Sequence, residues 1–170
     1  MLSDLRAQIK RQLLRRLSYD ASVSFNPDDL AAGIRRDVEW IGVQPDVDLE
    51  VYWKILPIGK GPAISFYAFG FQILKFDCFG ARDGHFHLFL GWPSPTGEDR
   101  IWLPEPNATA QVERAIFELR RNAPYYLQRH AHERVRRLHL EPATWSTACT
   151  QARDRMLHFL CSVPELADVK

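Results

Sequence analysis

Apolar residues recur along this chain with two different periods. From about residue 49 to residue 103, apolar and polar side chains alternate, which is the pattern of strands with one buried face. On both sides of this region, apolar residues recur every three or four positions, as on one face of an amphipathic helix. The two patterns together predict an α+β fold, in which helices from both ends of the sequence pack on an antiparallel sheet.

The N-terminal part of the chain is predicted to form two helices. Residues Ser3–Leu17 place leucine and isoleucine at helical spacing, with basic residues between them. A second helix is expected over Pro27–Ile41, because Asn26 is a good N-cap for it and Gly42 can end it. The positions that this helix would bury are Leu30, Ile34, Val38 and Ile41.

The middle of the chain is predicted to form about four strands. Short connections between them indicate an antiparallel meander. The alternation shifts at Gly70, so the second strand is expected to be either one long strand or a strand with a β-bulge at this residue. The expected strands are Leu49–Leu56, Ala63–Phe79, His85–Trp92 and Arg100–Leu103. The expected connections are turns at Gly59–Pro62 and Ala81–Gly84 and a loop at Pro93–Asp99.

The C-terminal third is predicted to form about three helices. The first begins after Asn107 or Thr109 and runs to about Arg121. Asn122 and Pro124 are expected to break it and to start a second helix that reaches about Leu138. The third helix runs from Pro142 to about Cys161 and has a regular apolar stripe.

Composition favours a single globular domain over residues 1–170. A length of 170 residues is ordinary for one domain, and 46% hydrophobic with 12% aromatic residues argues against intrinsic disorder. The three cysteines, Cys78, Cys149 and Cys161, are odd in number and lack metal-site spacing, which indicates reduced thiols rather than a secreted disulfide framework. Cys78 is interpreted as a structural thiol.

The expected localisation is cytoplasmic. No stretch reaches the ~18 apolar residues of a membrane span, and the N-terminus lacks the apolar core of a secretory signal. A mitochondrial transit peptide is the alternative for this basic, amphipathic start, and Asp4 weighs against it. The enrichment in alanine and arginine is compatible with a bacterial source.

Charge is distributed unevenly along the chain. Residues 107–140 carry seven arginines and three acidic groups, whereas residues 19–106 carry seven basic and thirteen acidic groups. One interpretation is that the helices expose solvated arginines. The other is a basic face, built by the first helix and residues 120–137, that binds an acidic partner protein or a second copy of the chain. Nucleic acid is a disfavoured partner because the net charge is only +1 and no recognition motif is present.

His85 and His87 are the most suggestive pair in the sequence. They lie two residues apart, so on a strand they point to the same side of the sheet and can hold one divalent metal ion. A third ligand would come from elsewhere, and Asp77, Asp83 and Glu98 are the candidates. The alternative is a pair of solvent-facing histidines that share a face with Phe89.

Two further groups are candidate ligand-binding residues. Aromatic residues fall on both faces of the predicted sheet, so one face can line a cavity for a small apolar ligand or form a dimer surface. Candidate lining residues are Tyr52, Tyr67 and Trp92, together with Trp53 and the two histidines. In the C-terminal helices, Tyr126, His130 and Arg134 have four-residue spacing and would form one polar row, whereas His130 and His132 would diverge. In each case ordinary packing is the competing explanation.

No motif in the sequence specifies a reaction. Neither a nucleophile elbow nor a phosphate-binding loop is present, and no motif points to an organic cofactor. The favoured hypothesis is a non-enzymatic binding or interaction module that associates with itself or with another protein. The alternative is a metal-dependent enzyme or metal-binding protein centred on His85 and His87.

Overall fold

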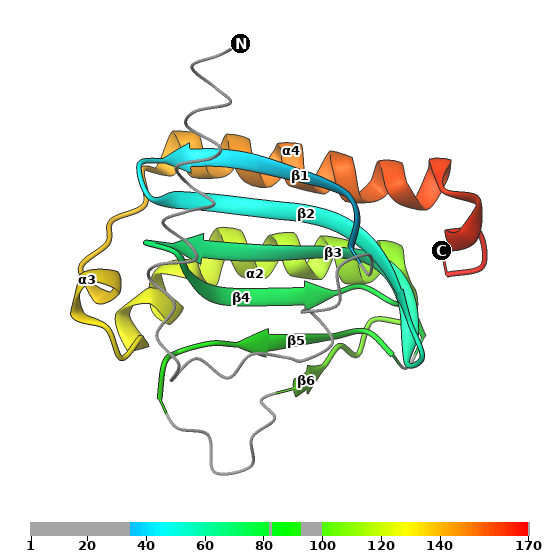
Figure 1. Cartoon of the computed structure of the whole chain (residues 1–170), viewed down its shortest axis with the longest axis horizontal. Helices are drawn as coiled ribbons and strands as arrows, with labels where there is room; N and C mark the ends of the chain where they lie inside the picture. The colour runs from blue at the N-terminus through cyan, green and yellow to red at the C-terminus, as the bar shows by residue number, and fades with distance from the viewer. Residues whose placement is uncertain (1–34, 82, 93–99, 170) are drawn as a thin grey trace.

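The computed structural model describes residues 35–81, 83–92 and 100–169. Several expectations lie outside these residues: the helix over Ser3–Leu17, the loop at Pro93–Asp99, and Glu98 as a metal ligand. Within the described residues the fold is α+β, as predicted. An antiparallel sheet forms one layer and helices form the other (Figure 1).

The sheet is a meander in which every strand pairs with its neighbour in the sequence. The order is β1-β2-β3-β4-β5-β6, and all five pairings are antiparallel. The longest strands are the first three, which pair along most of their length. The six strands are β1 (Arg35–Gln44), β2 (Val47–Leu56), β3 (Gly59–Ala68), β4 (Phe71–Asp77), β5 (His85–Leu88) and β6 (Arg100–Trp102).

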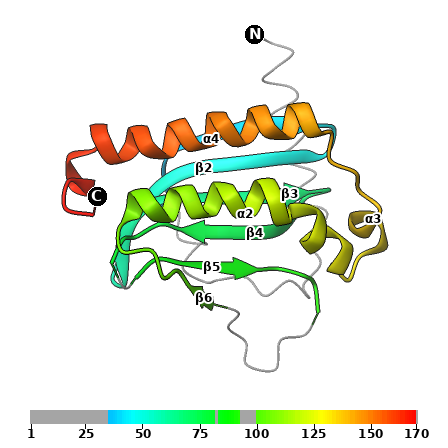
Figure 2. The same ribbon diagram turned by 180° about the vertical axis from the view of Figure 1, so that it is seen from behind.

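Two long helices cover one face of this sheet. Figure 2 shows α2 (Ala108–Arg129) and α4 (Pro142–Ser162) running side by side over the strands. The short helix α3 (Glu133–Arg136) connects them, and the 3-10 helix η2 (Pro164–Leu166) follows α4. No described helix is long and apolar enough to cross a membrane.

Side-chain caps fix where the two long helices begin. The Asn107 side chain accepts a hydrogen bond from the backbone N–H of Ala110 at 2.8 Å, and Glu141 accepts one from Thr144 at 2.7 Å. Each bond satisfies one of the N–H groups that lack a partner in the first turn of a helix. Pro142 follows at the first position of α4, where its missing N–H has no consequence.

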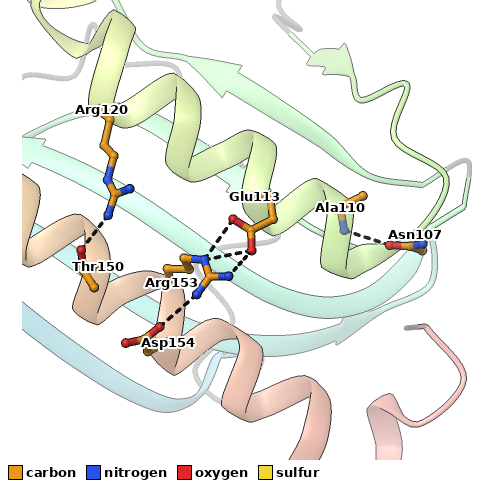
Figure 3. A network of polar contacts seen from close by, with 7 residues as sticks. All are labelled: Asn107, Ala110, Glu113, Arg120, Thr150, Arg153 and Asp154. Carbon is orange, nitrogen blue, oxygen red and sulfur yellow. Dashed lines mark hydrogen bonds and ion pairs between the residues drawn. The ribbon is translucent and has the colours of Figure 1, made fainter.

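The hydrophobic core lies between the helices and the sheet. Phe66 from β3 packs against Trp145 from α4 with tilted rings whose centroids lie 4.9 Å apart, and the Trp145 indole donates to the Leu119 carbonyl at 3.0 Å. On the outer surface, Arg153 of α4 forms a two-pronged ion pair with Glu113 of α2, and Arg120 donates to Thr150 (Figure 3). Further core residues include Leu49, Val51, Ile64, Leu74, Phe76, Val112, Ala115, Ile116, Ala152, Met156 and Phe159.

The predicted helix over Pro27–Ile41 is wrong from residue 35 onwards. Residues 35–44 form β1, with Ile41 and Val43 buried two positions apart, and Val38 is 42% exposed. The β1–β2 register shifts between Arg36 and Glu39, where Asp37 has a φ of 50°. This irregularity disturbs the alternation, so the apolar spacing imitates a helix.

The predicted single strand Ala63–Phe79 is two strands joined by a tight turn. Phe69 and Gly70 make the turn with φ values of 53° and 83°, so Gly70 marks a hairpin rather than a bulge. A phenylalanine rarely adopts this left-handed conformation. Its backbone N–H donates to the Asp46 carbonyl at 2.7 Å, and the Arg134 guanidinium lies 3.9 Å from the centre of its ring.

Other boundaries also differ from the predictions. Residues 59–62 belong to β3 rather than to a turn, and β5 ends at Leu88 rather than Trp92. Pro124 lies inside α2 and does not break it. The loss of one backbone hydrogen bond at Pro124 is tolerated because Ala123 and Leu127 on the inner face of α2 are buried in the core.

Candidate metal centre

The second face of the sheet carries polar side chains that are nevertheless buried. Side chains alternate along each strand, so the neighbours of the core residues point away from α2 and α4. Asp48 and Glu50 from β2 lie on this face, and five further ionisable residues gather beside them toward β5, with exposed fractions between 0% and 8%. They are Lys54 from β2, Lys75 and Asp77 from β4, and His85 and His87 from β5.

Strand register brings the two histidines to the carboxylate. Asp77 pairs with His85 across the β4–β5 ladder, and Lys75 pairs with His87. The Nε2 atom of His85 lies 3.4 Å from Oδ2 of Asp77, and the Nε2 atom of His87 lies 3.9 Å from the same oxygen. One potential ligand atom from each of the three residues falls within 4.8 Å of the other two.

The hydrogen bond of His85 determines which ring nitrogen carries the proton and which one presents its lone pair to Asp77. Its Nδ1 lies 2.7 Å from the backbone carbonyl oxygen of Asp83, and a carbonyl only accepts, so Nδ1 carries the proton. In the neutral ring Nε2 is therefore an acceptor, and it faces a carboxylate oxygen, which is also an acceptor. A cation between them, either a proton or a metal ion, removes this conflict.

His87 offers a second imidazole nitrogen to the same point. Among the described residues its buried Nε2 has no hydrogen-bond partner. Burial lowers the pKa of His87 to about 4, although the nearby Asp77 charge acts in the opposite direction. At neutral pH the ring is therefore uncharged, which is the form that binds metals.

Asp77 stays ionised despite its complete burial. Burial by itself raises the pKa of this carboxyl, but the charges of Lys75 and Lys54 together with His85 hold it well below its usual value. The Nζ atom of Lys54 lies 3.0 Å from Oδ1, and that of Lys75 lies 3.5 Å from Oδ2. The carboxylate is thus ionised, which is the form that binds a metal ion. A metal ion would share it with the two ammonium groups that already contact it.

Two histidines and one carboxylate form a ligand set that is common in metalloproteins. Imidazole nitrogen and carboxylate oxygen bind first-row ions at about 2.0–2.2 Å, which places such ligands roughly 3–4 Å apart. The measured separations need only small side-chain adjustments to reach this range. Three protein ligands leave coordination positions open, as in catalytic rather than closed structural sites. The carbonyl that holds Nδ1 of His85 is the usual outer partner of a metal-bound histidine.

Of the predicted third ligands that the structure describes, Asp77 joins the pair and Asp83 does not. Asp83 contributes its backbone carbonyl while the residue itself is exposed. The histidines share a face with Phe89, as predicted, and the His87 and Phe89 rings stack at 5.9 Å. The alternative of a solvent-facing pair is wrong, because His85 is 1% exposed.

The candidate lining residues Tyr52, Tyr67 and Trp92 make different contacts in the structure. Tyr52 is buried beside Lys54, with the ammonium 6.0 Å from its ring centre. The Tyr67 hydroxyl donates to Glu50 at 3.0 Å. Trp92 is 62% exposed and its indole donates to the backbone carbonyl of Arg129 at 2.8 Å.

The predicted row of Tyr126, His130 and Arg134 does not exist. His130 is the buried C-cap of α2, and His132 is the N-cap of α3, so the chain leaves the helix between them. The Tyr126 hydroxyl donates to Glu118, and Arg134 pairs with Asp46. The spacing was misleading because the helix ends at Arg129.

Sequence reasoning missed Lys54 and Lys75 as members of the centre. Each lysine lies between two large apolar residues, at a position of its strand that points to the same side as the other polar residues. This alternation could have identified both lysines from the sequence. Cys78 agrees with its structural interpretation: burial, followed by the nearby Asp77 charge, raises its thiol pKa well above the usual value. The thiol is thus protonated at neutral pH and is not an activated nucleophile.

Comparison of the chain with protein-family models, with curated proteins and with solved structures gives no match. Function must therefore be inferred from the chain's own side chains.

Proposed function

We propose that this protein binds one divalent first-row transition metal ion through Asp77, His85 and His87, as the centre of a metal-dependent enzyme. The observation that carries the proposal is the convergence of three ligand atoms within 4.8 Å on a buried face. Imidazole nitrogen with carboxylate oxygen suits zinc, iron, manganese or nickel. The number of protein ligands supports a catalytic role, because open positions allow water or substrate to reach the ion.

Metal analysis after reconstitution tests this proposal. The untagged protein is first treated with a chelator and then supplied separately with Zn²⁺, with Mn²⁺ or, in the absence of oxygen, with Fe²⁺. After desalting, the bound metal is measured by inductively coupled plasma mass spectrometry. We expect about one equivalent of at least one ion in the native protein and none in the His85→Ala/His87→Ala variant.

His158→Ala is the matched control for this experiment. His158 is exposed on α4, so its removal alters the histidine content without touching the proposed centre. This variant should bind as much metal as the native protein. A native protein that retains no ion after reconstitution, or a double variant that retains as much as the control, contradicts the proposal.

The interaction-module hypothesis is a second candidate, favoured by the outer side of α2. Phe117 and Tyr125 expose half of their surface there, and the Arg129 guanidinium lies 3.7 Å from the Tyr125 ring centre. Exposed aromatic and arginine side chains are common at the centres of protein interfaces.

If the chain associates with itself through this surface, sedimentation velocity should show a dimer, and the Phe117→Ser/Tyr125→Ser variant should be a monomer. A monomeric native protein at high micromolar concentration removes the self-association version.

A further inference from the structure

The strand beyond the histidines places an arginine beside the proposed centre. Arg100 of β6 pairs in register with His87, so its side chain starts on the same face of the sheet. It lies close enough for its charge to act on the imidazole of His87. The next residue on this face of β6 is Trp102, which pairs in register with His85.

Arg100 forms no ion pair within the part of the chain that the structure describes. Its Nε atom is buried without a hydrogen-bond partner among the described residues. Besides its effect on His87, its guanidinium carbon lies 5.6 Å from the ring centre of Trp102. A guanidinium has five N–H donors in a fork that matches the two oxygens of a carboxylate or phosphate.

Trp102 connects the buried centre with the surface of the protein. Its ring centre is 5.4 Å from that of His85, which is buried, while Trp102 itself is 55% exposed. β6 is the last strand in the order, so this side of the sheet ends at Trp102 and Arg100. A ligand that approaches along β6 meets the arginine and the indole before it reaches the histidines.

We propose that the centre takes an oxyanion as its substrate or co-ligand, with one oxygen on the metal ion and another paired with Arg100. This proposal rests on the proposed metal-binding function. The ligand class is a small carboxylate or phosphate, because both present two oxygens at the spacing of the arginine fork. Trp102 supplies an apolar wall beside the anion and restricts the approach of water.

Co²⁺ is the probe that tests this proposal, since its visible spectrum changes when a ligand enters the coordination shell. The Co²⁺-loaded protein is titrated with acetate, with inorganic phosphate and with imidazole. Acetate or phosphate should change the spectrum at millimolar concentration, and the stronger of the two identifies the preferred oxyanion. In Arg100→Gln the affinity for that oxyanion should fall about tenfold or more, the usual effect of losing one charge-assisted pair.

Three comparisons separate this proposal from the metal site itself. Arg100→Gln should bind Co²⁺ and imidazole as the native protein does, because neither needs the guanidinium, and Arg100→Lys should recover part of the oxyanion affinity. Oxyanion affinity that is equal in native and Arg100→Gln proteins overturns the role of Arg100. A response to imidazole without any response to acetate or phosphate overturns the oxyanion proposal alone. Failure to bind Co²⁺, Zn²⁺, Mn²⁺ or Fe²⁺ overturns both proposals together.

Discussion

The two faces of the sheet are built by the same strands but are buried for different reasons. On the face toward α2 and α4, apolar side chains such as Phe66 pack against the helices, and the hydrophobic effect accounts for their burial. On the other face, Lys54, Lys75 and Asp77 are buried although the burial of charges is unfavourable. Packing alone accounts for the apolar face, whereas the polar face needs a structural or chemical reason and is therefore the more informative one about function.

Among the substitutions that test this difference between the two faces, removal of the Asp77 carboxylate should lower the free energy of unfolding most. Asp77→Ala takes the carboxylate away from two buried ammonium groups, and we expect a loss of about 3–5 kcal/mol in the free energy of unfolding. Phe66→Ala on the apolar face should lose a similar amount through the cavity that it leaves. Urea unfolding followed by circular dichroism measures both.

The two variants should differ in their response to metal. Zn²⁺ should stabilise the native protein and Phe66→Ala, because ligands that bind the folded state raise its stability. Asp77→Ala should not respond. If Zn²⁺ stabilised both variants equally, Asp77 would not be a ligand. If it stabilised neither the variants nor the native protein, the polar face would be a structural ion-pair cluster without a metal site.

A buried histidine away from the centre gives the next largest effect. Burial, followed by the charge of His132, lowers the pKa of His130 to about 4, from an ordinary value of 6.5. The unfolded chain therefore binds a proton at this residue at a higher pH than the folded chain does, so stability is lost as pH falls from about 6.5 toward 4. We expect His130 to contribute about 2 kcal/mol of this loss between pH 7 and pH 4.5, less than the full shift implies, because pH 4.5 is still above the pKa of the folded state.

Unfolding of the native protein and of His130→Gln at pH 7 and pH 4.5 measures this contribution. The variant should lose less stability on acidification than the native protein. His158→Ala should behave as the native protein, because His158 is exposed. Equal acid sensitivity in all three proteins would assign the pH dependence to other groups.

Lys75 should compete with the metal ion for Asp77. Its ammonium lies 3.5 Å from the oxygen that faces both histidines, so it repels a cation placed there. Lys75→Met should therefore bind Zn²⁺ about tenfold more tightly, which corresponds to about 1.4 kcal/mol. Competition with a chromophoric chelator measures the affinity, and Lys60→Met, at a half-buried lysine paired with Asp168, is the control. Weaker binding in Lys75→Met would instead make Lys75 a supporting partner of the site.

The smallest effect is expected where charges meet at the surface. Arg153 pairs with Glu113 between α4 and α2, in contact with solvent (Figure 3). Arg153→Ala should lower the free energy of unfolding by less than about 1 kcal/mol, and less still in 1 M salt. A loss comparable to that of Asp77→Ala would remove the distinction between buried and exposed ion pairs in this molecule.

Local pattern predicted more of the fold than of the site. The cap at Asn107, the start of α4 at Pro142 and the apolar stripe of α4 depend on neighbours in the sequence, and these predictions are confirmed. The turn at Phe69 was not predictable because its unusual backbone is held by Asp46 and Arg134, which are distant in the sequence. The start of β1 was missed because an irregularity near Asp37 disturbs the period.

The candidate site was predictable in part. The spacing of His85 and His87 identified the pair, and Asp77 was among three candidates for the third ligand. Choosing it required the β4–β5 register, which places Asp77 opposite His85. The roles of Lys54 and Arg100 depend on pairings across the sheet and could not be read from local sequence.

All three proposed ligands come from one pair of adjacent strands, β4 and β5, between Asp77 and His87. Closing so short a loop takes far less time than assembling the whole sheet and docking its helices. The ligands can therefore meet while the rest of the chain is still unfolded, and a metal ion can bind this segment and fix its register before the core forms. Metal would then increase the folding rate more than it decreases the unfolding rate, whereas affinity for the unfolded chain would limit the gain in equilibrium stability.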